Sequence, residues 1–238
     1  MNFQPSDFKE IDRYWADRLN CSPRLFQQTG NFILANESLS GGILITTHTF
    51  NCTIVQTPPE LLSAIEEQLN VAPLLSPDRV MTALVKMERV RLGWRDLIYY
   101  FPPDLPLPPQ NLAVRALTSQ DEAAVAELLS LVSAEERFLG LLQFEQECTV
   151  GLFQEEVLLA IAFLVLKNAA LAEVTMITHP YYRKSELGRD VMIAVIRRGL
   201  ERRWLIQYTL RAQDQQSRQV AESLGFWLYA TQQFFYLI

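Results

Sequence analysis

The spacing of apolar residues predicts a helix at the start of the chain and mostly strands after it. Phe8, Ile11, Trp15 and Leu19 recur every three or four positions, as on the buried face of an amphipathic helix. The later runs are short, rich in β-branched and aromatic residues, and bounded by turn residues, which is typical of strands. The elements expected here are a helix at 8–19, a strand at 32–35, a hairpin of strands at 43–47 and 52–57, helices at 61–69 and 80–85, and a strand at 97–101.

The second half of the chain shows two helix-start signals and a series of apolar runs. Ser119 with Glu122, and Ser133 with Glu136, each fit a capping box, in which two side chains bond the free amides at a helix start. Three apolar runs separated by turns predict an antiparallel meander. The expected order is a strand at 114–117, two helices, strands at 149–153, 157–166 and 171–178, a long helix at 187–200, a strand at 205–210, a helix at 217–224 and an aromatic strand region at 226–238.

A proline-rich segment separates the two halves. Five of the twelve prolines lie between Phe101 and Pro109, where they remove backbone donors and favour polyproline geometry. We therefore expect an N-terminal α+β domain at 1–101, a linker at 102–111 and a second domain at 112–238.

Composition narrows the class of protein. The chain has 238 residues, of which 49% are hydrophobic and 20% are charged, values that exclude collagen-like and broadly disordered chains. The longest apolar run, Val157–Leu166, is ten residues long, whereas a membrane span needs about 20. The first residues lack the pattern of a secretory signal, so a cytoplasmic location is expected. Three scattered cysteines and two histidines offer no metal-ligand spacing, and no metal is expected.

The charge of the chain is unevenly distributed. The net charge is −6, but the segment from Arg183 to Arg218 holds nine basic residues and four acidic ones. A basic segment in an acidic protein favours contact with an anion, whereas duplex nucleic acid requires a larger basic surface. The alternative is a helix with solvated arginines.

The segment from Thr178 to Arg189 leaves a predicted strand and opens the long helix. Backbone N–H groups at such a turn point into one space, and the helix dipole there favours an anion. Arg183, Lys184 and Arg189 would add positive charge. The turn is therefore a candidate pyrophosphate site, and the alternative is an ordinary helix start capped by Ser185.

At this turn the chain resembles the GNAT superfamily of acyl-coenzyme A dependent N-acetyltransferases. The family's motif at a strand-to-helix turn is Pro-x-x-Arg/Gln-x-x-Gly-x-Gly/Ala, of which Pro180, Arg183 and Gly188 match. The run 217–226 is similar to the family's Asn-x-x-Ser/Ala through Leu-Gly-Phe signature, with Asp214 in the place of the asparagine. The resemblance implies a GNAT-like mixed sheet with flanking helices in the C-terminal half.

The resemblance also implies an activity and a set of site residues. The activity is transfer of an acetyl group from acetyl-CoA, a co-substrate, to an amine that attacks the thioester directly. The pantetheine would run along the strand and the pyrophosphate would lie at the helix start. The residues implied for binding the cofactor are Met176, Ile177, Thr178, Arg183, Lys184, Ser185, Glu186, Leu187, Gly188, Arg189, Asp214 and Ser217. Glu173 is the candidate general base, with a sheet-edge carboxylate as the alternative, and Tyr229 is the candidate acid, with Tyr208 or water as alternatives.

The chain departs from the family's pattern in ways that bear on activity. Lys184 and Glu186 replace flexible glycines of the phosphate loop, and Ala221 stands where many members have a tyrosine acid. A carboxylate beside bound pyrophosphate would be repelled, so these residues also fit a non-catalytic CoA-binding or regulatory module. A third possibility is a structural protein that associates through the aromatic end, 226–236.

The N-terminal half resembles the degenerate GNAT-like half that precedes the active half in bacterial two-domain members. The cues are Tyr14–Trp15, Gly30, the strand end at 55–58 and Gly93; an unrelated α+β substrate domain is the alternative. The expected partner is a small-molecule or protein amine acceptor, with no nucleic acid and no membrane, and the chain is expected to be a monomer or homodimer.

Overall fold

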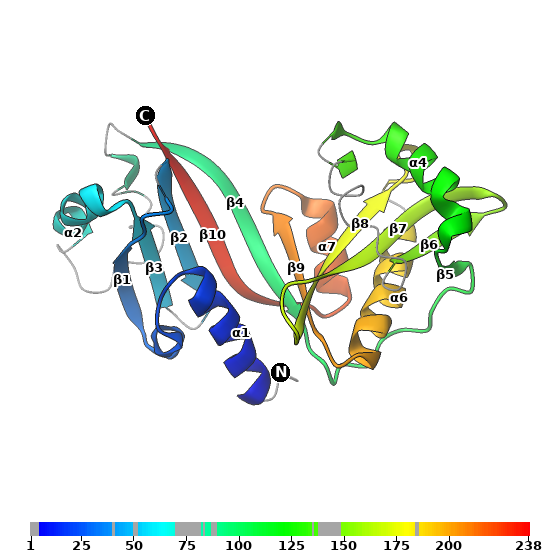
Figure 1. Ribbon diagram of the computed structural model, residues 1–238, viewed down its shortest axis with the longest axis horizontal. Coiled ribbons are helices and arrows are strands. Elements are labelled where there is room, and N and C mark those ends of the chain that lie inside the picture. The colour runs from blue at the N-terminus through cyan, green and yellow to red at the C-terminus, as the bar shows by residue number, and fades with distance from the viewer. Residues whose placement is uncertain are drawn as a thin grey trace. The chain divides into compact units, whose positions relative to one another are not determined.

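The contacts of the chain divide it into two compact units (Figure 1). The computed structural model describes residues 5–39, 41–49, 52–69, 82, 84–86, 90–134, 136–137, 149–183 and 186–238. The first unit holds the described residues of Gln4–Tyr99, Leu210–Gln213 and Leu228–Ile238, and the second holds Tyr100–Thr209 and Asp214–Trp227 as far as they are described.

The first unit is a sheet with two helices. In order of pairing, the strands that lie wholly or mostly in this unit are β1 (Gly30–Ala35), β3 (Cys52–Thr57), β2 (Gly42–His48), β10 (Trp227–Leu237) and β4 (Val90–Phe101). β1 runs parallel to β3, whereas β2 is antiparallel to both β3 and β10, so the predicted hairpin is confirmed. The helices are α1 (Pro5–Arg18) and α2 (Leu62–Leu69), where apolar spacing predicts them.

Apolar side chains from the sheet and from α2 form the core of the first unit. Ile45 and Phe235 from neighbouring strands pack with Ile65 of α2, and each is at most 2% exposed. Leu84 joins the same cluster. It belongs to the helix predicted at 80–85, of which residues 80, 81 and 83 lie outside the described residues.

The last strand lies in a different unit from the one that its place in the sequence suggests. β10 pairs with β2 from Ala230–His48 to Tyr236–Gly42, although it falls within the predicted range 112–238. Phe235 of β10 packs in one core cluster with Ile43 and Ile45 of β2. A contact between segments so far apart in the chain leaves no local signal in the sequence. The domain predicted at 112–238 therefore includes residues Leu228–Ile238, which the structure places in the first unit.

The second unit contains the predicted meander. In order of pairing, the strands that lie wholly or mostly in it are β9 (Leu205–Arg211), β8 (Leu171–Thr178), β7 (Val157–Leu166), β6 (Thr149–Gln154) and β5 (Val114–Ala116). β5 to β8 are antiparallel to their neighbours, and β8 and β9 are parallel. The helices are α4 (Glu122–Leu131), α6 (Leu187–Glu201) and α7 (Gln215–Ser223). An α+β fold with a mixed sheet and flanking helices is confirmed.

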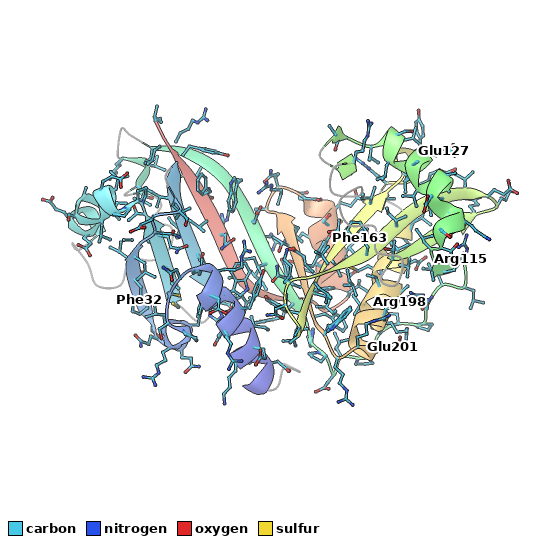
Figure 2. All side chains as sticks on the ribbon, in the orientation of Figure 1. Phe32, Arg115, Glu127, Phe163, Arg198 and Glu201 are labelled. Carbon is cyan, nitrogen blue, oxygen red and sulfur yellow. The ribbon has the colours of Figure 1, made fainter. Side chains whose placement is uncertain are left out.

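Helices α4 and α6 cover opposite faces of this sheet (Figure 1). Leu128 of α4 packs in a cluster with Phe163 and Ile177. The neighbouring side chains on β8, Met176 and Thr178, instead lie under Gly188 of α6. Because side chains alternate along a strand, each position of β8 can be assigned to one face. Figure 2 labels Phe163 on β7 within this unit.

One capping box lies one residue earlier than predicted, and the other is confirmed. Thr118 and Asp121, rather than Ser119 and Glu122, form the first box. Asp121 also accepts two hydrogen bonds from Arg115, at 2.6 and 2.9 Å. The hydrogen bond from Arg115 holds the pKa of Asp121 below its usual range. The capping-box pattern takes no account of this ion pair with Arg115, which holds the Asp121 carboxylate beside Thr118.

The proline-rich segment packs on the second unit. The Arg197 guanidinium donates to the Pro108 carbonyl at 3.0 Å, and the Asn111 amide donates to Asp190 at 2.7 Å. Leu105 lies beside Gly225, whose φ is +86°. The segment is therefore anchored by α6 and by the turn that ends α7.

The described residues lack two features, a membrane-spanning helix and a cluster of metal-ligating side chains. No helix among them is long and apolar enough to cross a membrane. They contain no cluster of three or more histidine, cysteine, aspartate and glutamate side chains suited to a metal ion.

Candidate cofactor site

The parallel strands β8 and β9 are paired over only part of their length. Their register joins Leu171 to Leu205, Ala172 to Ile206 and Glu173 to Gln207. β8 continues to Thr178 and β9 to Arg211, but the register holds no further pair of described residues. An edge of β8 past Glu173 is thus left for hydrogen bonds to an extended ligand.

The N-terminus of α6 lies against the end of β8. A side chain on Gly188 would put its Cβ 3.0 Å from the Met176 sulfur and 3.4 Å from the Thr178 hydroxyl. Glycine therefore allows the first turn of the helix to rest on the strand. Before it, the 3-10 turn Pro180–Tyr182 is capped by His179, whose Nδ1 accepts from the Tyr181 amide at 3.3 Å. The predicted residues Lys184 and Ser185 lie outside the described residues.

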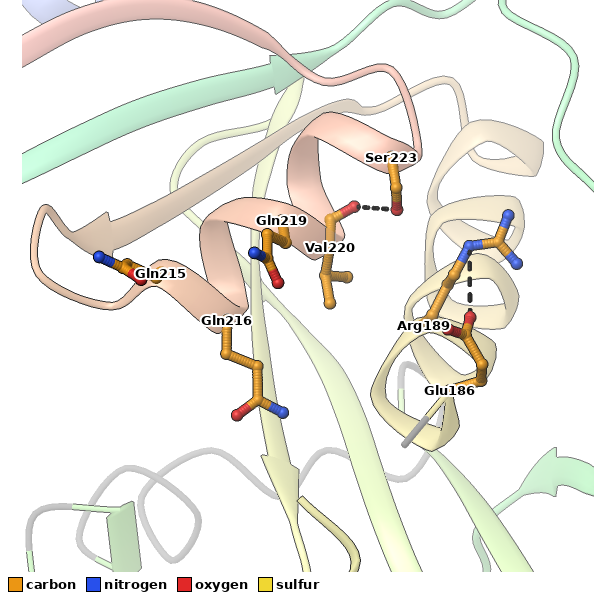
Figure 3. A pocket seen from close by; sticks show the side chains of 7 residues that line it. All are labelled: Glu186, Arg189, Gln215, Gln216, Gln219, Val220 and Ser223. Carbon is orange, nitrogen blue, oxygen red and sulfur yellow. Dashed lines mark hydrogen bonds and ion pairs between the residues drawn. The ribbon is translucent and has the colours of Figure 1, made fainter. Parts of the chain in front are cut away.

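A hollow of about 440 Å³ lies between the start of α6 and one face of α7 (Figure 3). Its volume is within the range of small-molecule sites. The side chains that line it are mostly amides and charged groups: Glu186, Arg189, Gln215, Gln216, Gln219, Val220 and Ser223. Three carboxamides can each donate and accept hydrogen bonds, so the hollow suits a ligand with several polar groups. The glutamines of α7 are residues that motif reasoning missed.

The two charged residues of the hollow face each other. Arg189 Nε lies 3.9 Å from Glu186 Oε2, as the dashed line in Figure 3 marks. Glu186 is the N-cap residue of α6 but makes no capping hydrogen bond with its side chain. An incoming anion would meet the Arg189 cation and the helix start, with the Glu186 carboxylate beside it.

Arg183, a second of the three basic residues predicted at the pyrophosphate site, is bound to protein groups. Its Nη2 lies 2.7 Å from Glu136 Oε1, and its Nε donates to the Thr178 carbonyl at 3.5 Å. Glu136 is held in turn by the Ser133 hydroxyl and amide. Burial favours a higher pKa for Glu136, but the bonds from Ser133 and Arg183 outweigh it and lower the pKa.

Asp214 and Ser217 cap α7. The Ser217 amide donates to Asp214 Oδ1 at 3.0 Å, and its hydroxyl donates to Oδ2 at 2.7 Å. Ser217 is also hydrogen-bonded by Tyr208, whose burial raises its pKa to about 12. Neither Asp214 nor Ser217 is among the residues lining the hollow. Their cofactor contact therefore stays a prediction, while their capping role is observed.

Glu173 lies at the last pair before β8 and β9 separate, and both of its oxygens have partners. Lys167 Nζ is 2.6 Å from Oε2, and Gln207 Nε2 donates to Oε1 at 3.2 Å. Gln207 also donates to Thr209 at 3.0 Å and accepts from the Tyr100 hydroxyl at 2.6 Å. Sequence reasoning missed these partners, because they come from a turn and from two other strands.

Tyr229 belongs to the first unit, whereas Glu173 belongs to the second. The Tyr229 side chain is fully buried, and its hydroxyl donates to Asp12 Oδ1 at 2.9 Å. Its ring lies 4.3 Å from that of His48. His48 ends β2, as the hairpin prediction has it, and burial lowers its pKa to about 4. The structure therefore gives Tyr229 and His48 core contacts.

Comparison with solved structures identifies the fold. A GNAT-family acetyltransferase from Colwellia psychrerythraea matches with a TM-score of 0.54 and 14% identity, over 77% of this chain and 76% of that one. A GCN5-related N-acetyltransferase from Sphaerobacter thermophilus matches with a TM-score of 0.54 and 13% identity, over 66% of this chain. The match spans only 56% of the length of the Sphaerobacter protein.

Sequence comparison adds nothing to this structural likeness. No model of a protein family matches the chain, and no curated protein matches it. The fold is nevertheless shared over most of the chain with an acetyltransferase structure. The chain has the fold of the GNAT superfamily of acetyltransferases.

Proposed function

We propose that the protein is an acyl-CoA dependent N-acetyltransferase that binds acetyl-CoA in its second unit. The observation that carries this proposal is the separation of β8 from β9 after Glu173, beside the start of α6. An extended pantetheine amide chain can bond to a free strand edge, and a pyrophosphate suits a helix N-terminus. The hollow with Arg189 and the α7 glutamines lies at the same helix start.

The arrangement supports direct transfer of the acetyl group. With the thioester at the point where the strands separate, an amide of β8 is available to polarise its carbonyl. An amine nitrogen would attack the carbonyl carbon, the C–S bond would break, and the thiolate would leave. Glu173 is the carboxylate at this point, and we assign it the proton released by the attacking amine.

Calorimetry and a turnover assay together test the proposal. Titration of the full chain with acetyl-CoA should show binding at one site, and a panel of amines should then release free thiol. Binding without thiol release from any amine would support a CoA-binding module instead, as the Glu186 carboxylate and Ala221 suggest. No binding at all would contradict both functions.

A further inference from the structure

Three aromatic side chains form a row across β4 and β10, which are neighbouring strands of the first unit. Phe234 stacks on Trp94, with ring centroids 5.4 Å apart and an angle of 5° between the ring planes. Tyr236 meets Phe234 edge to face at 5.0 Å. Phe235, which lies between them in the sequence, packs in one cluster with Ile65 of α2. Because side chains alternate along a strand, the aromatic row lies on the face of the sheet away from α2.

An arginine of the first unit lies at each end of the aromatic row. The Arg91 guanidinium carbon is 5.5 Å from the centroid of the Tyr236 ring, and that of Arg211 is 5.3 Å from the Trp94 ring. Arg211 also pairs with Asp96 at 2.7 Å, whereas Arg91 is exposed and pairs with no described carboxylate. A guanidinium plane is itself a surface on which a nucleic-acid base can stack. Its N–H groups can bind a phosphate at the same time.

The aromatic row is accessible to a ligand. The Tyr236 side chain is 40% exposed, and Trp94 and Phe234 are half-buried. Aromatic rings beside positive charge are the shared features of surfaces that bind single-stranded nucleic acid, because bases stack on the rings and cations meet the phosphates. The bases of a duplex are already stacked on one another and could not use the rings. The charge argument from the sequence, which requires a larger basic surface, applies to that duplex form.

A hydrogen-bonding group beside the aromatic row distinguishes RNA from DNA. Gln232 lies two residues before Phe234 and therefore on the same face of β10. Its Nε2 donates to the Thr46 hydroxyl at 3.2 Å, which leaves its Oε1 atom as an acceptor. The 2′-hydroxyl of a ribose can donate to this oxygen, whereas a deoxyribose has no such donor.

We propose that the aromatic row and Arg91 bind single-stranded RNA, with bases on the rings and on the Arg91 guanidinium, and with a 2′-hydroxyl on Gln232. This inference goes beyond the proposed function and does not rest on it, because it uses no residue of the second unit. Asp96 partly neutralises Arg211, so Arg91 is the main contact for phosphate. Arg211 instead holds the indole at the other end of the aromatic row.

Fluorescence anisotropy of a labelled uridine oligomer of about ten nucleotides, titrated with the full chain, tests the proposal. Arg91→Ala and Tyr236→Leu should each raise the Kd by at least about fivefold, through loss of a phosphate contact and of a stacking surface. Arg218→Ala, at an exposed arginine of the second unit, should leave the Kd unchanged. The slope of log Kd against log salt should fall by about 0.7 in Arg91→Ala, the value of one phosphate contact on a single strand.

The matching deoxyuridine oligomer should bind the wild type more weakly than the RNA oligomer does. Gln232→Leu should remove this difference, because it removes the acceptor of the 2′-hydroxyl hydrogen. Equal Kd values for the two oligomers in the wild type would overturn the assignment to RNA.

The proposal would also be overturned by an absence of RNA binding, or by a Kd that Arg91→Ala and Tyr236→Leu leave unchanged. An equal loss in Arg218→Ala would show general charge attraction and overturn it too. Binding of anionic phospholipid vesicles in place of RNA would assign the aromatic row to a membrane surface instead. Should circular dichroism show that Tyr236→Leu is unfolded, Arg91→Glu takes its place. These titrations contain no acetyl-CoA, so their failure leaves the proposed function untouched.

Discussion

The arginines of the basic segment have separate partners. Arg183 pairs with Glu136, Arg211 with Asp96 and Arg218 with Glu222. Among the described arginines of the segment, Arg189 is the one that lines the hollow. Arg198 lies toward the C-terminal end of α6, as Figure 2 shows with Glu201 beside it. The positive charges of the segment are therefore divided among several ion pairs. The number of basic residues in the sequence overstates the positive charge that one bound anion would contact.

Replacement of Glu186 by glutamine should tighten acetyl-CoA binding. Glu186 is 80% exposed and lies 3.9 Å from Arg189, so its carboxylate would repel the pyrophosphate and compete for the guanidinium. We expect the calorimetric Kd to fall by about three- to tenfold, the scale of one charge at a helix start. Glu201→Gln, at the other end of the same helix, should leave the Kd unchanged. An unchanged Kd for Glu186→Gln would place the pyrophosphate elsewhere.

His48 should make the first unit less stable in mild acid. Burial lowers its pKa to about 4, below the ordinary value of about 6.5. Between these values the unfolded chain binds more protons than the folded one, so stability is lost as the pH falls. The loss should reach at most about 3 kcal/mol. Denaturation by urea at pH 7 and pH 5 should show a smaller pH effect for His48→Gln than for the wild type; equal effects would contradict this account.

The helices and strands that the sequence predicts correctly are those with a long apolar pattern confined to one segment of the chain. Helix α6 and the strands β6, β7 and β8 lie where their apolar patterns predict them. The pairing of β10 with β2 was not predictable, because it joins segments about 180 residues apart. The same limit applies to the site. The turn at Pro180 and Gly188 has a local motif, whereas the partners of Glu173 come from Gln207 and a turn.

The contact between α6 and β8 predicts a coupling between Gly188 and Met176. Gly188→Ala gains about 1 kcal/mol of helix propensity, but its Cβ would lie 3.0 Å from the Met176 sulfur. Overpacking of this kind costs about 1–3 kcal/mol, so unfolding should show a net loss of stability. Adding Met176→Ala should make the double variant more stable than the sum of the two single effects predicts. Strict additivity would show that the helix start does not rest on this side chain.

In the whole molecule, the two units are not successive segments of the chain. The first unit takes its last strand from the C-terminus, after the chain has passed through the second unit. The proline-rich segment alone suggested a simple division at 102–111. Proline composition reports local stiffness, and it carries no information about where a later strand will pair.

A fragment of residues 112–238 should therefore associate with itself. It carries β10, whose pairs with β2 and whose buried Phe235 need residues that the fragment lacks. Unpaired apolar strands promote association. Size-exclusion chromatography with light scattering should show oligomers for the fragment but not for a matched fragment of residues 100–226. A monomeric 112–238 fragment as stable as the full chain would refute the assignment of β10 to the first unit.

The central claim is that acetyl-CoA binds where β8 separates from β9. Mapping of backbone amide chemical shifts on the full chain, with and without acetyl-CoA, tests it most directly. We expect the largest shifts at 174–178, at 186–189 and on the glutamines of α7, with small shifts in the first unit. Shifts confined to the first unit, or none at saturating acetyl-CoA, would contradict it.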